Sequence, residues 1–127
     1  MEDLRAEVYF RLPKAPRSAA FCDDELVAST ERLKAALSKR GYAGEEIIAS
    51  NMFFVGSLEF DIYPDGSSAD AWCICCHLWG GWNLEKWNRA NWAVHDMLLE
   101  WGAEGIEWFD RQRVVRRGEG RPAPEPP

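Results

Sequence analysis

The sequence contains none of the short motifs that mark the common catalytic and nucleotide-binding sites. It has neither a G-x-G-x-x-G loop nor a G-x-x-x-x-G-K-[ST] loop, the glycine-rich segments that hold phosphate groups. It also has no G-x-S-x-G nucleophile elbow and no H-E-x-x-H metal site. We therefore predict no catalytic residues and no cofactor from motifs.

Long apolar runs and export signals are also missing. No stretch reaches the ~18 uninterrupted apolar residues of a membrane-spanning helix. The start, MEDLRAEVYF, has no basic run followed by an apolar stretch and a small-residue cleavage site, so no signal peptide is predicted. Three of the four cysteines, Cys73, Cys75 and Cys76, lie beside His77. Without an export signal, this clustering favours reduced thiols and a cytoplasmic location.

Positive charge is scarce over most of the chain. The 127 residues carry a formal net charge of −6. The segment from Arg113 onward holds four arginines and two glutamates, a net +2, so the preceding body carries −8. An acidic body repels the phosphate backbone, so we expect no nucleic-acid binding. It attracts a basic partner instead, although a charge of this size also serves solubility alone.

The residues that are abundant point to one aromatic-rich domain. A length of 127 residues predicts a single domain that buries its core without disulfides. Aromatic residues make up 13% of the chain and include seven tryptophans. Large rings bury much area and recur at interfaces, so the excess indicates a ring-rich core or a binding surface.

Hydrophobic periodicity predicts the element order β-α-β-β-α-β. Alternation marks the strands, and stripes at helical spacing between N-cap and glycine stop signals mark the helices. The predicted elements are a strand at 6–12, a helix from Asp23 to Gly41, paired strands at 52–65 and 69–79, a helix from Asn83 to Gly102, and a strand at 106–115.

This order predicts an α+β fold, a two-layer sandwich of an antiparallel sheet with two helices on one face. The arrangement is the ferredoxin-like split pattern. Residues 1–115 would form the single domain. The segment 116–127 is rich in Pro, Gly and Arg and has almost nothing to bury, so we expect a disordered tail.

The alternation in 52–65 predicts which side chains face the helices. Phe54, Leu58, Phe60 and Ile62 share one face, which we expect to be buried. Glu59, Asp61 and Tyr63 then lie on the open face of the sheet, where Tyr9 of the first strand joins them. A mixture of acids and tyrosines is typical of a docking surface, although an ordinary solvated face fits the same pattern.

Trp92 is anomalous, because it lies roughly 150° from the centre of its helix's apolar stripe, counted at ~100° per residue. A tryptophan among charged residues often marks a contact site. The alternative is that the ring is covered, either by Arg89 one turn earlier through a cation–π contact or by the C-terminal tail.

A strand places Cys73, Cys75 and His77 on one face. Residues four apart on a strand are ~13 Å apart, too far to share one zinc ion, so no metal site is predicted. A nucleophilic Cys75–His77 pair, with His77 oriented by Asp61 or Glu59, remains an alternative.

In size, acidity and tryptophan content the chain resembles the immunity proteins of bacterial toxin systems, which neutralise a toxin by covering its active site. This resemblance rests on general character and not on a signature. It implies a module that binds a basic protein partner, and our candidate contact residues are Tyr9, Glu59, Asp61, Tyr63 and Trp92. Two alternatives are a small enzyme or ligand-binding domain that uses Cys75, His77 and Asp61, and a self-associating structural or phage-type component.

Overall fold

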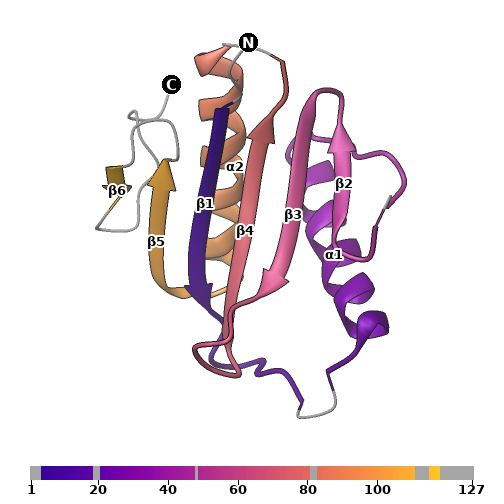
Figure 1. Ribbon diagram of the computed structural model, residues 1–127, viewed down its shortest axis with the longest axis vertical. Helices are drawn as coiled ribbons and strands as arrows, with labels where there is room; N and C mark the ends of the chain where they lie inside the picture. The colour runs from indigo at the N-terminus through magenta and orange to yellow at the C-terminus, as the bar shows by residue number, and fades with distance from the viewer. Residues whose placement is uncertain (1–3, 19–20, 48, 81–82, 111–114, 118–127) are drawn as a thin grey trace.

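The computed structural model describes residues 4–18, 21–47, 49–80, 83–110 and 115–117 (Figure 1). The elements are β1 (Leu4–Arg11), α1 (Asp23–Ser38), β2 (Met52–Val55), β3 (Leu58–Pro64), β4 (Ala71–Leu78), α2 (Leu84–Glu100), β5 (Glu104–Asp110) and β6 (Val115–Arg117). The strands form one antiparallel sheet in the order β2-β3-β4-β1-β5-β6. Both helices lie behind this sheet in Figure 1. The predicted α+β two-layer sandwich is confirmed.

The sheet order differs from a simple ferredoxin fold, because β2 and β6 extend its two edges. The segment 52–65 is not the single strand that we predicted. A turn at Gly56 and Ser57 divides it into β2 and β3, and Val55 lies opposite Leu58. Gly56 has a φ of 61°, a left-handed conformation that glycine adopts without strain. The second predicted strand, 69–79, is β4.

The turn at Gly56 also corrects the predicted face of Phe54. Because β2 runs back beside β3, Phe53 pairs with Phe60 and is fully buried. Phe54 pairs with Glu59 and lies on the open face with it. Its predicted inward orientation was therefore wrong, whereas Leu58, Phe60 and Ile62 are buried as expected.

The helix boundaries follow the predicted cap and stop signals closely. Asn83 caps α2, since its Oδ1 accepts a 3.0 Å hydrogen bond from the amide of Lys86. The stops at Gly41 and Gly102 are confirmed, with φ angles of 93° and 73°. The N-cap of α1 is Cys22, not Asp23, which is instead the first helical residue. An acid in this first turn still interacts favourably with the helix dipole.

The core lies between the sheet and the helices and is rich in rings. Trp87 of α2 and Trp108 of β5 are almost completely buried. The indole nitrogen of Trp87 donates to the carbonyl of Cys76 at 3.2 Å, and that of Trp108 donates to His95 Nδ1 at 3.1 Å. His95 is therefore a structural residue. Further core side chains are Leu4, Val8, Phe10, Leu33, Leu37, Ile74, Val94, Met97 and Leu98.

The C-terminal predictions are only partly covered by the described residues. The strand expected at 106–115 begins earlier, as β5, and residues 111–114 lie outside the described part. Val115–Arg117 form β6 beside β5. Residues 118–127 are not described, so the disordered tail remains a prediction. Neither helix in the described part has both the length and the apolar character that crossing a membrane requires.

Candidate functional site

The candidate site is the open face of the sheet, opposite the helices. Alternation and register place on it the odd-numbered residues of β1, β3 and β4. Four of the five predicted contact residues lie here: Tyr9, Glu59, Asp61 and Tyr63. Within the described residues, no helix crosses this face in Figure 1.

The fifth predicted residue, Trp92, belongs to a different surface. It lies on α2, in the layer that covers the other face of the sheet. Arg89 pairs with Glu85 and not with the ring of Trp92. The half-buried Trp92 ring instead meets His95 edge to face, with 5.4 Å between ring centroids. One flat interface cannot include Trp92 together with the other four residues.

The centre of the open face is a buried carboxyl group, that of Glu7 on β1. Glu7 is only 3% exposed, and its Oε2 accepts hydrogen bonds from Tyr9 at 3.2 Å and from Tyr63 at 3.1 Å. The Sγ of Cys73 lies 3.2 Å from the Tyr63 hydroxyl. Burial raises the pKa of Tyr9 to about 12 and raises the pKa of Tyr63 further, so both phenols remain neutral donors.

Alternation in β1 puts Glu7 on the same face as Tyr9, but it does not reveal that the acid is buried there. The pairing of β1 with β4 sets Glu7 opposite Cys75, a small side chain in the middle of the sheet. Tyr9 and Tyr63 then close over the carboxyl group. The signal that could have predicted this arrangement is the pair of tyrosines that share the odd-numbered face with Glu7, Tyr9 on β1 and Tyr63 on β3, with β4 between the two strands.

A second group, which we call the acid–indole cluster, consists of Glu59, Asp61, His77 and Trp79. The indole nitrogen of Trp79 donates to Glu59 Oε1 at 2.8 Å. The rings of His77 and Trp79 are stacked, with centroids 4.1 Å apart and planes 23° apart. Trp79 is 48% exposed and forms the outer part of the cluster. Trp79 continues the alternation of Cys73, Cys75 and His77, which places it on this face.

The two carboxyl groups of the cluster share a proton. Burial, the hydrogen bond with Glu59 and the charge of Glu59 raise the pKa of Asp61 to about 8. Burial acts upward on Glu59 as well, but hydrogen bonds from Asp61 and Trp79 outweigh it and lower the pKa of Glu59. At neutral pH Glu59 is therefore ionised, and Asp61 is protonated and donates to it.

Arg5 supplies positive charge beside the buried acid of this face. Its guanidinium interacts with Cys75, Glu7 and Tyr63, and the first of these contributes most to raising the pKa of Arg5. The Nε of Arg5 is buried and has no hydrogen-bond partner among the described residues. Arg5 thus places a cation close to Glu7 and to the two acids Glu59 and Asp61.

The geometry does not favour a nucleophilic role for Cys75. This residue is fully buried, and burial raises the pKa of Cys75 to about 12 despite the opposing charge of Arg5. Its thiol is protonated at neutral pH, whereas a catalytic cysteine needs a lowered pKa. Asp61 lies opposite Cys75 in the sheet, and the acid opposite His77 is Glu59.

The described residues also contain no group of three His, Cys, Asp or Glu side chains arranged to hold a metal ion. No protein-family model matches the chain, and neither a curated protein nor a solved structure is significantly similar to it.

Proposed function

We propose that this chain is a protein–protein interaction module of the immunity or antitoxin kind, which binds and neutralises a basic protein partner such as a toxin. The proposed docking surface is the open sheet face, with Tyr9, Glu59, Asp61, Tyr63 and Trp79 as its contact residues. In this proposal the module acts in the bacterial cytoplasm. The acid–indole cluster is the observation that carries the proposal.

The cluster suits a lysine or arginine side chain of the partner. Glu59 is ionised and is held by two donors, Asp61 and the indole nitrogen of Trp79. An incoming cation can pair with Glu59 while its alkyl stem or guanidinium plane lies on the exposed Trp79 ring. Because Glu59 and Trp79 already restrain each other, little side-chain freedom is lost on binding.

The tyrosines extend this surface towards β1. Hydrogen bonds to Glu7 hold the hydroxyl groups of Tyr9 and Tyr63 on the sheet, and both side chains are half-buried. Rigid aromatic rings of this kind give large contact area at low entropic cost. The acidic body adds long-range attraction of a basic partner, which speeds association at low salt.

Two finer points belong to the same proposal. We propose that β3-β4-β1-β5 represent a ferredoxin-like core to which β2 and β6 are added at the edges, since these four strands and the two helices follow the predicted chain order.

Trp92 remains a proposed contact only for a partner that also reaches the helix layer.

A comparative capture experiment tests the docking surface. The immobilised chain is incubated with lysate of its native cell as wild type, as the double variant Glu59→Gln/Trp79→Ala, and as Glu31→Gln. Glu31 is an exposed acid of α1, so Glu31→Gln makes the same change of charge in the helix layer. We expect wild type and Glu31→Gln to retain the same basic protein and the double variant to lose it at least tenfold.

The captured protein then tests neutralisation. Its expression in a host should arrest growth, and co-expression of the wild-type chain, but not of the double variant, should restore growth. Equal capture by all three chains would reject the open face as the docking surface. A dimer of the chain alone that Trp79→Ala disrupts, detected by sedimentation, would assign the face to self-association instead.

A further inference from the structure

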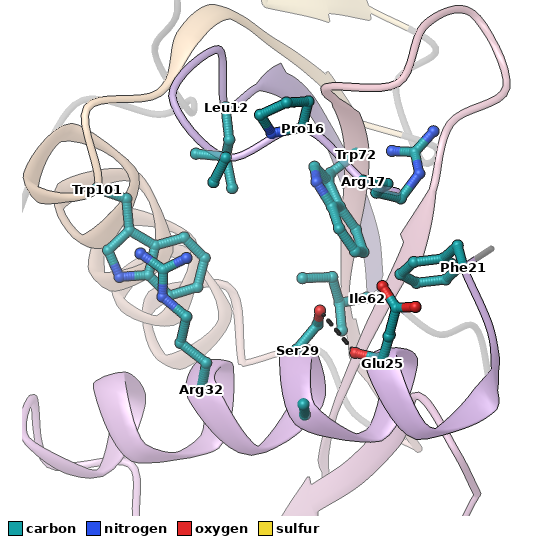
Figure 2. Close-up of a pocket in the computed structure, with 12 residues that line it drawn as sticks. Leu12, Pro16, Arg17, Phe21, Glu25, Ser29, Arg32, Ile62, Trp72 and Trp101 are labelled. Carbon is teal, nitrogen blue, oxygen red and sulfur yellow. Dashed lines mark hydrogen bonds between the residues drawn. The ribbon is translucent and has the colours of Figure 1, made fainter. Parts of the chain in front are cut away.

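A cavity of about 290 Å³ lies on the helix side of the sheet, where β1 ends and β4 begins (Figure 2). Its floor includes Ile62 of β3 and Trp72 of β4, and Trp101 at the end of α2 forms one wall. Ile62 and Trp72 both face the helices and belong to the core cluster. The cavity is therefore separate from the acid–indole cluster, which lies on the opposite face.

The cavity exists because α1 presents small side chains to it. Glu25, Ala28, Ser29 and Arg32 line the cavity, and their spacing puts them on one side of the helix. The hydroxyl of Ser29 donates to the carbonyl of Glu25 at 3.0 Å, so it turns back onto its own helix. Ala28 and Ser29 are too short to fill the space above Ile62 and Trp72.

Aromatic rings form two walls of the cavity. Figure 2 shows Trp101 and Trp72 on opposite sides, with Phe21 beyond Trp72. The Phe21 and Trp72 rings meet edge to face, with centroids 5.7 Å apart. The Trp72 indole nitrogen is buried without a hydrogen-bond partner in the described part of the chain. Such walls accommodate a flat apolar group.

Two cations and one acid line the cavity, although the whole chain has a net charge of −6. The guanidinium of Arg17 is held in place by hydrogen bonds that it donates to the carbonyl oxygens of Ala71, Asp65 and Ser68. Arg32 is different, because its guanidinium lies 4.2 Å from the Trp101 ring centroid and has no ion pair with any described residue. Arg32 is therefore available to an anion at the mouth of the cavity.

We propose that this cavity binds a small planar organic anion, an aromatic carboxylate, whose ring lies between Trp72 and Trp101 and whose carboxylate pairs with Arg32. The volume of about 290 Å³ lies just below the roughly 300 Å³ at which typical ligand pockets begin, so it suits only a small ligand such as one fused ring system with a short acid side chain. Arginine and carboxylate form a strong, charge-assisted pair. This proposal does not depend on the docking function of the open face.

The test uses indole-3-acetate, its neutral isostere indole-3-acetamide, and acetate as probes. Binding of each probe to the full chain is followed by calorimetry and by NMR of the indole N–H groups of Trp72 and Trp101. We expect indole-3-acetate to saturate the site, indole-3-acetamide to bind about tenfold more weakly, and acetate to give no saturable binding. The shifts should be concentrated on Trp72 and Trp101.

Three variants separate the contributions. Arg32→Gln should make the affinities for the acid and the amide equal, whereas Lys39→Gln, an equal change of charge just beyond α1, should alter neither. Ala28→Phe should fill the cavity and abolish binding of both, with the circular dichroism spectrum confirming that the variant is folded. The proposal is overturned if indole-3-acetate does not saturate, if wild type binds the acid and the amide equally, or if Arg32→Gln keeps the wild-type preference for the acid.

Discussion

Trp79 and Glu59 are joined by a 2.8 Å hydrogen bond that links the end of β4 to the start of β3. The backbone supports the same link, since the amide of Trp79 donates to the carbonyl of Ser57 at 3.0 Å. A half-exposed indole is thus held in one orientation beside an ionised carboxylate. Interface residues that contribute most binding energy commonly have this combination of ring, charge and restraint.

The first prediction concerns Trp79→Phe, which keeps an aromatic ring but removes the indole donor. Because the hydrogen bond from Trp79 lowers the pKa of Glu59, its loss should raise that pKa. The free energy of unfolding should change by less than about 1 kcal/mol, since Trp79 is half-exposed. Carbon-13 NMR titration of the Glu59 carboxyl group measures the shift, with Trp92→Phe as the control. An unchanged Glu59 titration would mean that the hydrogen bond does not form in solution.

The second prediction concerns the pH dependence of stability. The pKa of Asp61 is about 8 in the folded chain, above its ordinary value of 3.8, so the folded state binds more protons between these two values. The contribution of Asp61 to the free energy of unfolding is fully present below about pH 4 and is lost as the pH rises through about 8. The loss should be on the order of 2 kcal/mol, discounted because the carboxyl group is partly exposed.

Asp61→Asn isolates this contribution, because an amide keeps the size of the side chain and does not titrate. Urea unfolding of wild type and Asp61→Asn at pH 5.5 and pH 8.5 measures it. We expect the difference in unfolding free energy between the two proteins to shift in favour of the variant at the higher pH. If the difference in unfolding free energy between wild type and Asp61→Asn were constant with pH, the raised pKa of Asp61 and its proton shared with Glu59 would be contradicted.

The third prediction links the same proton to partner binding. A cation that pairs with the acid–indole cluster stabilises ionised Asp61, so complex formation should release a proton below about pH 8. The affinity for the captured partner should therefore rise from pH 6.5 to 8.5, by at most about tenfold per pH unit. Calorimetry in buffers of different ionisation enthalpy measures the release. Asp61→Asn should show none, and equal release by the variant would assign the proton to another group.

The fourth prediction concerns thiol reactivity. Cys22 is exposed, whereas Cys73, Cys75 and Cys76 are buried, and burial raises the pKa of each of these three. A thiol reagent at pH 7.5 should modify one cysteine quickly in the native chain and all four after denaturation. Cys22→Ser should abolish the fast reaction. Rapid labelling of Cys75 in the native chain would instead revive the nucleophilic alternative.

The fifth prediction concerns the core. Trp108→Phe removes the donor to His95 Nδ1 and leaves a small cavity at a position that is 1% exposed. These effects should reduce the free energy of unfolding by about 2 kcal/mol. Urea denaturation measures the loss, and Trp92→Phe should show less than half of it. An equal loss in both variants would mean that burial of Trp108 is unimportant.

Much of the fold could be predicted from local signals. Alternation assigned Leu58, Phe60 and Ile62 to the core because a two-residue period depends only on the strand itself. The cap at Asn83 and the stop at Gly102 were found because both depend on neighbouring backbone groups. The break at Gly56 was missed because the apolar runs on both sides of it were read as one continuous strand, although Gly56-Ser57 is itself a two-residue hairpin signal.

The site was less predictable, because its properties come from neighbours on other strands. Alternation placed Glu59 and Asp61 on the open face, but their unequal pKa values arise from mutual contact and from Trp79. Glu7 is buried by Tyr63, which is 56 positions away in the chain. The cavity beside Arg32 depends on Ala28 and Ser29 of α1 lying over Ile62 and Trp72, a tertiary contact that periodicity does not report.

The turn at Gly56 has a consequence for how another molecule can approach. It makes the outermost strand next to the acid–indole cluster only four residues long, Met52–Val55. So short a border offers few free backbone groups to an incoming strand and discourages open-ended stacking of copies. A partner that approaches from this side would therefore be recognised through side chains and not through backbone pairing. Single substitutions could then change binding without disturbing the sheet.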